Sequence, residues 1–138
     1  MITYTDSLDG IAAEHLNGFF ENWRRRPTAQ THLRLLRGSD HVVLALDDES
    51  GRVVGFVTAI ADGVLAAYLP LLEVLPDYRG HGIGRRLLRE MRQKLSGYYM
   101  VDVVCDEELV PFYEEQGFRR MPAISLRDYE KQDGRADG

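Results

Sequence analysis

Apolar residues change their spacing several times along the chain, and each change predicts a different element. The stretch ITYT (2–5) holds β-branched and aromatic residues and predicts a short strand. Apolar residues then recur at helical spacing over 7–20 and again over 28–36, where Gly38 provides a stop signal. The polar stretch 21–27 ends in a proline and predicts a loop. The N-terminal part is therefore expected to form one strand and two helices.

The middle of the chain predicts a run of antiparallel strands. HVVLAL (41–46) and RVVGFVTAIA (52–61) are separated by DDESG, whose aspartate, serine and glycine favour a turn, so the pair predicts a β-hairpin. Asp-Gly at 62–63 predicts a second turn, which leads into the long apolar segment 64–75. Pro70 interrupts that segment and predicts a bulge or a splay, because proline cannot donate to a sheet ladder.

The C-terminal half predicts two helices and two further strands. Residues 82–95 carry an apolar stripe with basic residues on the other sides, which is typical of an amphipathic helix. The apolar run 98–105 predicts a central, buried strand, and 107–117 a helix ended by its glycine. A last strand is expected within 121–129. This order of elements predicts a mixed α/β fold, in which a three-stranded meander feeds a β-α-β unit.

Length, composition and charge indicate one ordinary globular domain. The 138 residues are 44% hydrophobic and 28% charged, which suits a single compact core. We expect the domain to span 1–129, with the polar segment 130–138 as a disordered tail. The formal net charge of −5 argues against nucleic acid as the main partner, because phosphate backbones need a basic surface.

The cysteine content and the N-terminus predict a cytoplasmic protein. Cys105 is the only cysteine, so no internal disulfide can form, which fits a reducing compartment. The opening residues MITYTDSLDG lack the basic and apolar regions of a signal peptide. No apolar run approaches the roughly 20 residues that span a bilayer, so no membrane partner is expected.

Three glycines at alternate positions stand out in DYRGHGIGRRLLREM (77–91). Gly80, Gly82 and Gly84 lie where a strand gives way to a helix, and Arg79 precedes them. The first turn of a helix leaves backbone N–H groups unpaired and carries partial positive charge, and small residues let an anion approach them. The segment therefore predicts a phosphate-binding loop. A tight strand-to-helix turn without a ligand is the alternative.

The glycine spacing excludes two common nucleotide-binding loops. G-x-G-x-G misses the dinucleotide fingerprint G-x-G-x-x-G, and no β-α-β unit with the required acidic residue about 20 positions further on is evident. The phosphate loop G-x-x-x-x-G-K-[ST] is absent as well. The predicted phosphate must belong to another class of ligand.

Two motifs resemble those of the GNAT N-acetyltransferase superfamily. EVLPDYRGHGIGRRLL is similar to its acetyl-CoA motif, in which an Arg or Gln is followed by a glycine pair at fixed spacing after a V-x-P lead-in. DEELVPFYEEQGFRRM is similar to a second signature, an Asn seven residues before a Tyr and then Gly-Phe. The predicted element order agrees over nearly the whole of 1–129. The matching positions are Val74, Pro76, Tyr78, Arg79, Gly82, Gly84, Asp106, Tyr113, Gly117 and Phe118.

The resemblance implies a GNAT-like mixed, mostly antiparallel sheet with flanking helices and a V-shaped splay between strands 4 and 5. Acetyl-CoA would lie in the V, with its pantetheine arm paired to the backbone of 72–74 like an added strand. An N–H near Glu73 or Val74 would polarise the acetyl carbonyl. The residues implied to hold the donor are Leu72, Glu73, Val74, Arg79, Gly80, His81, Gly82, Ile83, Gly84, Asp106 and Tyr113.

Direct acyl transfer needs a proton acceptor for the amine and a proton donor for the thiolate. Tyr113 matches the family's usual acid, although an aromatic residue there could instead pack its helix on the sheet. Glu73 is a candidate base, or else a solvated carboxylate at a strand end. Asp106 replaces the family's Asn and could accept the same hydrogen bonds or bind a cationic amine. Cys105, in an apolar strand, is interpreted as a buried thiol.

The segment joining the first two predicted helices is the expected wall of the acceptor site. Phe20 and Trp23 would line an apolar pocket, with Tyr68 opposite. Phe19 and Phe20 could instead belong to the helix–sheet core. The arginines at 24–26 form either a solvated face or a contact for an acidic group on one of the substrates.

The sequence thus predicts an acetyl-CoA-dependent N-acetyltransferase. It would acetylate the primary amine of a small molecule, or of a peptide or protein, by direct attack in a ternary complex. The alternative is a non-catalytic acyl-CoA-binding or sensing module. A toxin that acetylates charged tRNA is a third class, which the net charge of −5 disfavours. No metal is expected, and the resemblance leaves a homodimer open.

Overall fold

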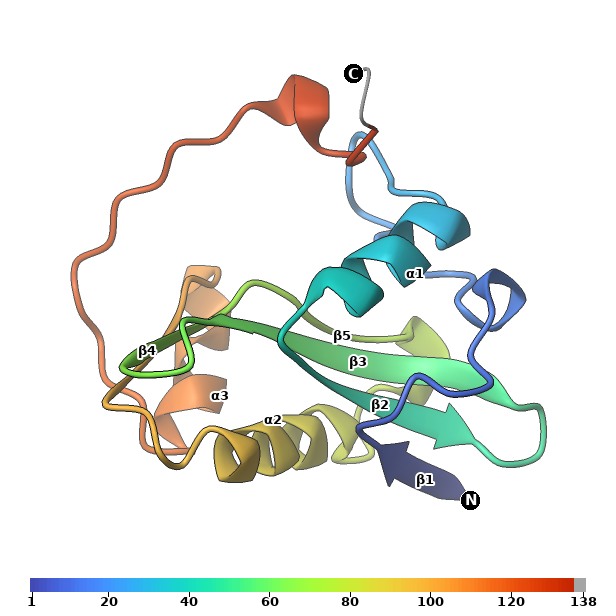
Figure 1. The fold of residues 1–138 in the computed structure, drawn as a ribbon, viewed down its shortest axis with the longest axis horizontal. Helices are drawn as coiled ribbons and strands as arrows, with labels where there is room; N and C mark the ends of the chain where they lie inside the picture. The colour runs from blue at the N-terminus through green and yellow to red at the C-terminus, as the bar shows by residue number, and fades with distance from the viewer. Residues whose placement is uncertain (136–138) are drawn as a thin grey trace.

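The computed structural model describes residues 1–135 and contains a six-stranded sheet with helices on both faces (Figure 1). None of the helices within these residues is long and apolar enough to cross a membrane. The strands are β1 (Ile2–Thr5), β2 (His41–Asp47), β3 (Arg52–Ala61), β4 (Ala66–Leu69), β5 (Leu72–Val74) and β6 (Met100–Val103). The helices are α1 (Ala29–Gly38), α2 (Ile83–Lys94) and α3 (Val110–Glu114), with 3₁₀ turns η1 (Ala13–His15), η2 (Pro76–Tyr78), η3 (Glu107–Leu109) and η4 (Tyr129–Lys131).

The sheet is mixed and mostly antiparallel, as predicted. Its strands run in the order β1-β2-β3-β4-β6, and β5 pairs with β3 beyond the end of β4. Every pair is antiparallel except β4 with β6, which is the pair that the β-α-β connection through α2 makes parallel. The predicted hairpin of β2 and β3 and the antiparallel step to β4 are confirmed.

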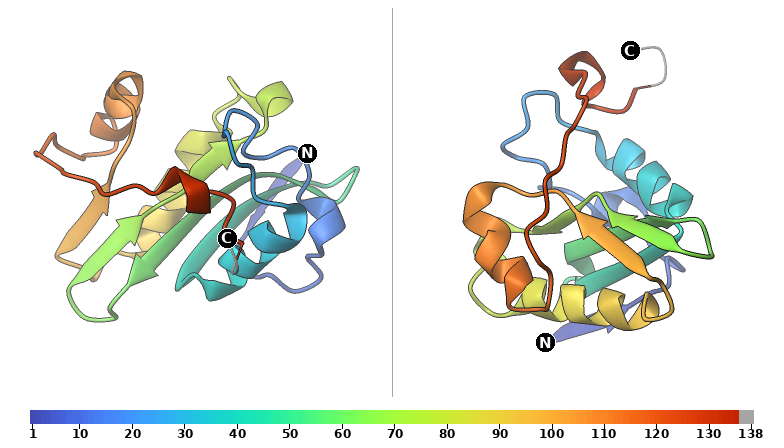
Figure 2. Two further views of the ribbon diagram at one scale, coloured as in Figure 1. Left: turned by 90° about the horizontal axis from the view of Figure 1, so that it is seen from above. Right: turned by 90° about the vertical axis from the view of Figure 1, so that its left-hand side faces the viewer.

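Helices α1 and α2 cover opposite faces of β3 (Figure 2, right). Successive strand residues face opposite sides, and Gly55 and Phe56 show this directly. A Cβ added to Gly55 would lie 3.0 Å from Leu87 of α2, so glycine lets α2 pack closely on the strand. The Phe56 ring meets His32 of α1 on the other face, with ring centroids 4.4 Å apart. The core therefore has two layers, one on each side of β3.

The long predicted strand over 64–75 is divided at Pro70. Residues Ala66–Leu69 form β4 and Leu72–Val74 form β5, and both pair with β3. Proline lacks the N–H that a continuous ladder needs, which explains why the strand breaks at this position. The expected splay is confirmed, and it separates β5 from β6.

The predicted helix over 7–20 is wrong, because only the short turn η1 forms there. Gly18 has φ +96, and a Cβ on it would lie 2.9 Å from the Arg52 guanidinium. Phe20 also has a left-handed φ of 62, so the chain cannot continue as a right-handed helix. The apolar residues of this segment are nevertheless core residues, since Leu16 and Phe20 are each 2% exposed.

The prediction of a central strand at 98–105 is also wrong, because β6 is the outer edge of the sheet (Figure 2, left). Its residues alternate between exposed and half-buried instead of being fully buried. No strand forms within 121–129, where the chain runs extended in a wide arc away from the sheet (Figure 1). The two errors are linked. A strand within 121–129 that paired with β6 would have made β6 an internal strand of the sheet, and without it β6 stays at the edge.

The segment expected to be a disordered tail is ordered as far as residue 135, and η4 crosses the predicted boundary at 129. The Arg25 N–H donates to Gln132 Oε1 at 2.9 Å, and Arg34 donates to the Gly134 carbonyl at 2.6 Å. Asp133 is 7% exposed. The tail thus docks beside α1. Residues 136–138 lie outside the described part of the chain.

Candidate active site

A cleft of about 1070 Å³ opens where the sheet splits. The β4–β6 pairing runs as far as Leu69 and Val103, after which β5 stays with β3 and the chain beyond β6 turns into η3. The cleft takes its walls from the loop at 20–23, from β5, from the glycine loop and from the segment 103–113. Predicted residues that line it are Phe20, Trp23, Leu72, Glu73, Val74, Arg79, Gly80, Gly82, Ile83, Gly84, Asp106 and Tyr113.

Among residues 1–135, the edge of β5 that faces the cleft pairs with no other strand, and its Val74 carbonyl accepts from the Arg79 side chain. The Leu75 N–H donates to the Val54 carbonyl at 2.8 Å, which fixes the register against β3. Alternate residues of an antiparallel strand direct their backbone groups to opposite edges. The backbone of Glu73 therefore bonds toward β3, whereas Leu72 and Val74 face the cleft. Of the two expected candidates for polarising the acetyl carbonyl, the Glu73 N–H points toward β3, which corrects that alternative, and the Val74 N–H points into the cleft.

The three glycines of the loop serve different purposes. Gly80 and Gly82 both have φ +81, a conformation that side-chain-bearing residues rarely adopt, and a Cβ on either would have open space around it. Gly84 lies inside α2, where a Cβ would make ordinary contact, 3.7 Å from Phe112 and from Val74. The first two glycines are thus required by the turn, and the surface above them is open.

The N-terminus of α2 has no cap. Its N-cap residue is Gly82, which has no side chain to accept from the first-turn N–H groups, and the first turn holds no acidic residue. The Arg86 N–H is the first to bond within the helix, at 3.0 Å from the Gly82 carbonyl. The N–H groups of 83–85 therefore remain for a ligand. Such an uncapped start, with its partial positive charge, is suited to an anion.

Side chains around the loop fix its position. The Tyr78 hydroxyl donates to Asp47 at the end of β2 at 2.7 Å, and Arg79 Nε donates to the Val74 carbonyl at 2.9 Å. The loop is thereby tied to two strands of the sheet. His81 is exposed, with Nδ1 3.3 Å from the Tyr78 carbonyl, and it does not line the cleft. Its side chain therefore stands outside the predicted donor site.

Tyr113 lies in α3 across the cleft from β5. It is 7% exposed and its ring packs edge-on against Phe112 and Phe118, with centroids 5.1 and 5.6 Å away. Burial raises the pKa of the Tyr113 phenol to about 12, so it stays protonated near neutral pH. The residue packs its helix and also lines the cleft, so the two interpretations of Tyr113 are compatible.

Glu73 lies on the face of β5 that meets the loop at 20–23. Its Oε1 accepts the Phe20 backbone N–H at 2.7 Å. Burial raises the pKa of the Glu73 carboxyl, while the Phe20 hydrogen bond and the Arg79 charge act in the opposite direction. Glu73 is therefore a half-buried carboxylate held by the backbone, and the interpretation of a freely solvated side chain is excluded.

The three residues predicted to bind the acceptor have different surroundings. Trp23 is half-buried and lines the cleft, as expected. The Phe20 ring is 2% exposed and packs against Trp23 and His32, so it offers an acceptor almost no surface. Tyr68 lines a second hollow beside β6 and is absent from the cleft. The acceptor prediction is thus corrected for Tyr68 and for the ring of Phe20.

Asp106 and Cys105 form the wall that continues from β6. Asp106 is the N-cap of η3 and lines the cleft, although its side chain caps no N–H of that turn. Cys105 is half-buried, and burial raises the pKa of its thiol, which disfavours a reactive thiolate. The expectation was a buried thiol, whereas Cys105 is only half-buried and lines the cleft.

Sequence reasoning missed several residues of the cleft. Asn22 and Phe112 lie in segments that the sequence assigns to the site, but nothing in their spacing marks these two residues as part of the cleft. Arg127 reaches the cleft from the extended C-terminal segment, whose path no local pattern indicates. Nothing in the sequence pointed to His32, which lies in the core and not in the cleft; it is 1% exposed, and its two ring nitrogens have no hydrogen-bond partner among residues 1–135.

Comparison with known proteins decides the family. Residues 38–120, which are 83 of the 138, match the acetyltransferase (GNAT) domain family. The chain belongs to the GNAT acetyltransferase family. The matched range holds the split strand, the glycine loop and Tyr113, whereas the loop at 20–23 and Arg127, which also line the cleft, lie outside it. The predicted GNAT-like fold is confirmed.

Solved structures share this fold over nearly the whole chain. A protein of Deinococcus radiodurans R1, provisionally assigned as an acetyltransferase, is 43% identical with a TM-score of 0.92, covering 96% of this chain and 92% of its own. A GNAT-family acetyltransferase of Streptococcus pneumoniae TIGR4 is 26% identical with a TM-score of 0.73, covering 92% and 98%. The second of these neighbours is thus a member of the same family.

Curated relatives match a smaller part of the chain. An uncharacterized N-acetyltransferase, ycf52, of Porphyra purpurea is 26% identical over 72% of this chain and 59% of its own length. The glucosamine 6-phosphate N-acetyltransferase of Trypanosoma brucei brucei is 31% identical over 51% of this chain and 53% of its own. The chain spans about three fifths of the length of the first of these relatives.

Proposed function

We propose that this protein transfers an acetyl group from acetyl-CoA to a primary amine. One observation carries the proposal: the cleft-facing edge of β5 leads directly into a loop with an uncapped helix N-terminus. Coenzyme A has a peptide-like pantetheine arm joined to a pyrophosphate, so its two parts match these two features in order. Membership of the GNAT family supports the same assignment.

The donor would be held mainly by backbone groups. The Leu72 and Val74 backbones would bind the pantetheine amides as an added strand does, and the N–H groups of 83–85 would bind the pyrophosphate. One of the two β5 N–H groups would also face the acetyl carbonyl. A fixed N–H at that position stabilises the developing oxyanion, an effect worth up to about 3–4 kcal/mol per donor.

Glu73 and Tyr113 would divide the two proton transfers. The neutral amine nitrogen forms a bond to the acetyl carbon, the carbon–sulfur bond breaks, and the electron pair leaves with sulfur. Glu73 takes the proton that the nitrogen loses, and the Tyr113 hydroxyl gives its proton to the thiolate. The raised pKa of the Glu73 carboxyl makes it a stronger base than an ordinary glutamate. No covalent intermediate on the protein is needed.

The acceptor end of the cleft favours a cationic amine with an apolar or cyclic body. Glu21 and Glu73 provide negative charge there, and the Trp23 ring provides apolar surface. A peptide or protein amine would meet the same groups. The similarity to a glucosamine 6-phosphate N-acetyltransferase makes a phosphorylated amino sugar the first acceptor to assay.

Calorimetric titration with acetyl-CoA, desulfo-CoA and ATP, followed by turnover assays, tests the proposal. We expect both CoA compounds to bind far more tightly than ATP, and acetylation of at least one amine among amino sugar phosphates, aromatic amines, polyamines and peptides. Binding without turnover of any amine would favour the acyl-CoA-binding module. No binding of either CoA compound would contradict the donor site itself.

A further inference from the structure

The loop between η1 and α1 is held at two points by groups that lie outside it. This loop, called here the acceptor loop, spans residues 20–27 and contains no helix or strand. At its start the Phe20 N–H donates to Glu73 Oε1 of β5 at 2.7 Å. Near its end the Arg25 N–H donates to Gln132 Oε1 at 2.9 Å. A loop without regular structure takes its position from such contacts, and here one of them comes from the C-terminal part of the chain.

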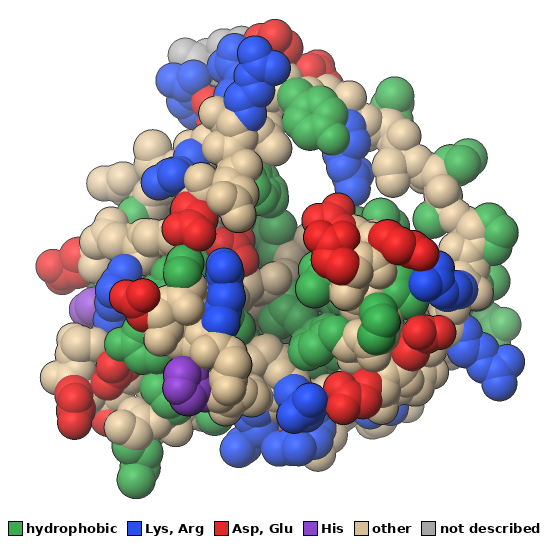
Figure 3. Space-filling view, turned by 180° about the vertical axis from the view of Figure 1, so that it is seen from behind, with side chains coloured by type: hydrophobic (Ala, Val, Ile, Leu, Met, Phe, Trp, Pro, Cys, Tyr) green, Lys and Arg blue, Asp and Glu red, His purple; other side chains and the backbone are tan. Residues whose placement is uncertain are grey.

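The docked tail, defined here as residues 129–135, makes further contacts with the same side of the molecule. The Arg25 guanidinium forms an ion pair with Glu130 at 3.0 Å, and Arg34 of α1 donates to the Gly134 carbonyl at 2.6 Å. Figure 3 shows acidic and basic side chains next to one another at this end of the molecule, the top of the view. The docked tail thus joins the acceptor loop to α1.

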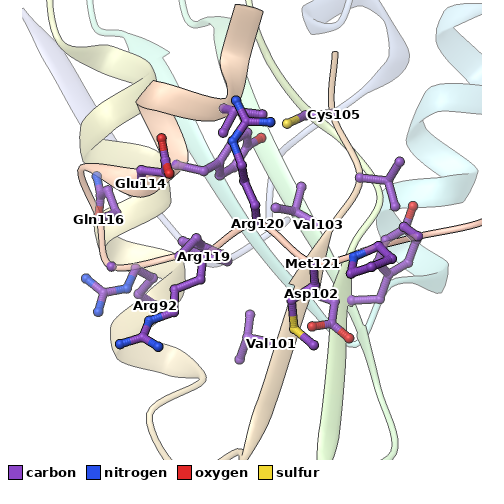
Figure 4. A pocket seen from close by; sticks show the side chains of 18 of the residues that line it. Arg92, Val101, Asp102, Val103, Cys105, Glu114, Gln116, Arg119, Arg120 and Met121 are labelled. Atoms are coloured by element: carbon purple, nitrogen blue, oxygen red, sulfur yellow. The ribbon is translucent and has the colours of Figure 1, made fainter. Parts of the chain in front are cut away.

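These contacts, and not the chain that leads to it, determine where the docked tail lies. The preceding segment begins at Arg120, which forms an ion pair with Glu107 at 2.8 Å. Figure 4 shows Arg120 and Met121 at the wall of the second hollow, beside β6. From there the chain runs in a wide arc, and no backbone–backbone hydrogen bond joins 121–127 to any other part of residues 1–135. The segment is therefore only a link between α3 and the docked tail.

The acceptor loop and the C-terminal part of the chain meet the cleft together. Arg127, two residues before the docked tail, lines the cleft with Asn22 and Trp23 of the acceptor loop. Trp23 lies between the two anchored residues, Phe20 and Arg25, and its ring packs on the Phe20 ring with centroids 4.8 Å apart. Loss of the anchor on the docked tail would therefore loosen the side of the loop that presents Trp23 to the cleft.

We propose that the docked tail positions the acceptor loop for amine binding, with Gln132 as the positioning residue. Gln132 does not line the cleft and acts through the backbone of Arg25, which is 107 positions away in the sequence. The inference rests on the proposed function, because that function places the amine at the end of the cleft near Trp23. It adds a determinant of acceptor affinity that belongs to neither the donor site nor the proton transfers.

Two substitutions of Gln132 separate its hydrogen bond from its size. Gln132→Met keeps the length of the side chain but cannot accept the Arg25 N–H, whereas Gln132→Glu keeps an accepting oxygen. Lys131→Met is the matched control, because Lys131 is the exposed neighbour of Gln132 and its ammonium pairs with Asp128 at 3.8 Å, away from the loop. The ion pair of Arg25 with Glu130 remains in all three variants, and because it is largely exposed it contributes little.

Tryptophan fluorescence reports the position of the acceptor loop without any substrate. Trp23 is the only tryptophan of the chain and is half-buried. In Gln132→Met we expect the acrylamide quenching constant to rise and the emission maximum to shift to longer wavelength, because the loop has lost an anchor. Gln132→Glu and Lys131→Met should match the wild type. An unchanged signal in Gln132→Met, an equal change in Lys131→Met, or no recovery in Gln132→Glu overturns the proposal.

Steady-state kinetics and calorimetry test the consequence for the acceptor. The amine is glucosamine 6-phosphate or, where this is not turned over, the most active amine of the panel described above. Gln132→Met should raise the KM for the amine by about 2- to 10-fold, the range expected for the loss of one ordinary hydrogen bond. The kcat and the acetyl-CoA affinity should change little, because the contact of Phe20 with Glu73 and the donor site are intact. Gln132→Glu should restore the KM.

Two kinetic outcomes overturn the proposal. A changed fluorescence signal with an unchanged KM would mean that the docked tail holds the loop without any effect on the acceptor. A parallel loss of acetyl-CoA affinity would mean that the substitution loosens the whole fold. Failure of the proposed function is seen separately, as a wild type that binds no CoA compound or acetylates no amine, whereas the fluorescence of Trp23 depends on neither.

Discussion

The Phe20 backbone N–H and the Glu73 carboxylate meet at 2.7 Å, although 53 positions separate them in the sequence. Phe20 presents this N–H from a left-handed conformation, with φ 62, while its ring is locked in the core. A strained, buried residue thus holds the Glu73 carboxylate at the wall of the cleft. The contact links the irregular N-terminal loop to the split strand, and the chemistry proposed for Glu73 depends on it.

Glu73→Gln should lower kcat by about 10²–10⁴-fold and leave acetyl-CoA affinity nearly unchanged. The glutamine carbonyl can still accept the Phe20 N–H, so the loop keeps its position while the base is lost. Steady-state kinetics and calorimetry measure the two effects. Glu14→Gln, on the exposed turn η1, is the control and should behave as wild type. Unchanged kcat in Glu73→Gln would remove this residue from the proton transfer.

The pH dependence of kcat/KM should report the ionisation of the Glu73 carboxyl. Glu73 must be ionised to act as a base, and burial raises its pKa. Activity should therefore be lost as the pH falls through a value above the ordinary glutamate range, and this acidic limb should disappear in Glu73→Gln. An acidic limb that persists in the variant would assign it to another group.

Tyr113→Phe should lower turnover about tenfold or more, with little change in acetyl-CoA affinity. The ring packing against Phe112 and Phe118 survives the substitution, so only the proton is removed. Because the pKa of the Tyr113 phenol is about 12, the hydroxyl stays protonated in the working pH range and should produce no basic limb below that value. Tyr129→Phe, at an exposed tyrosine, is the control. Full activity in Tyr113→Phe would exclude the phenol as the acid.

Gly82→Asp should weaken acetyl-CoA binding by roughly tenfold or more, because like charges at close range cost several kcal/mol. Gly82→Asn is the matched control, since asparagine has the same shape, tolerates a positive φ and carries no charge. Calorimetry on both variants separates the effect of the added charge on acetyl-CoA affinity from the effect of the backbone strain at a positive φ. Equal affinities would contradict a phosphate above this turn. Gly84→Asp should also weaken binding, but its side chain would in addition press on Phe112, so it is the less specific test.

The sequence predicted those parts of the site that are built locally. Gly80 and Gly82 mark a turn that needs positive φ, and a glycine N-cap with no acidic residue after it indicates an open helix start. Pro70 indicated the break between β4 and β5 for an equally local reason. The fold class followed from the same kind of pattern, since strand and helix periods are properties of short segments.

Features that depend on distant partners could not be predicted in this way. The apolar spacing over 7–20 identified core residues correctly but not their conformation, which Gly18 and Phe20 set by packing against the sheet. The apolar run at 98–105 suggested a central strand, because periodicity does not reveal which neighbours a strand has. Arg127 reaches the cleft only through the path of the extended segment 119–128.

His32 should make the stability of the protein depend on pH between about 6.5 and 4. Burial among Phe19, Phe20 and Phe56 lowers the pKa of His32 from 6.5 to about 4, so the folded state holds it neutral. Below pH 6.5 the unfolded chain binds a proton that the folded chain does not, so stability is lost as the pH falls toward 4. The linkage amounts to roughly 3 kcal/mol.

Urea unfolding at pH 7 and pH 4.5 measures this effect in the wild type and in His32→Phe. Carboxylates with lowered pKa values, such as Asp6 and Asp62, destabilise both proteins in acid, so the difference between the two isolates His32. The variant should lose less free energy of unfolding than the wild type over this interval. It also removes two buried nitrogens without partners, so it should not be less stable at pH 7 unless the larger ring overpacks the cluster. Equal losses in acid would mean that His32 is protonated, or accessible to water, in the folded state.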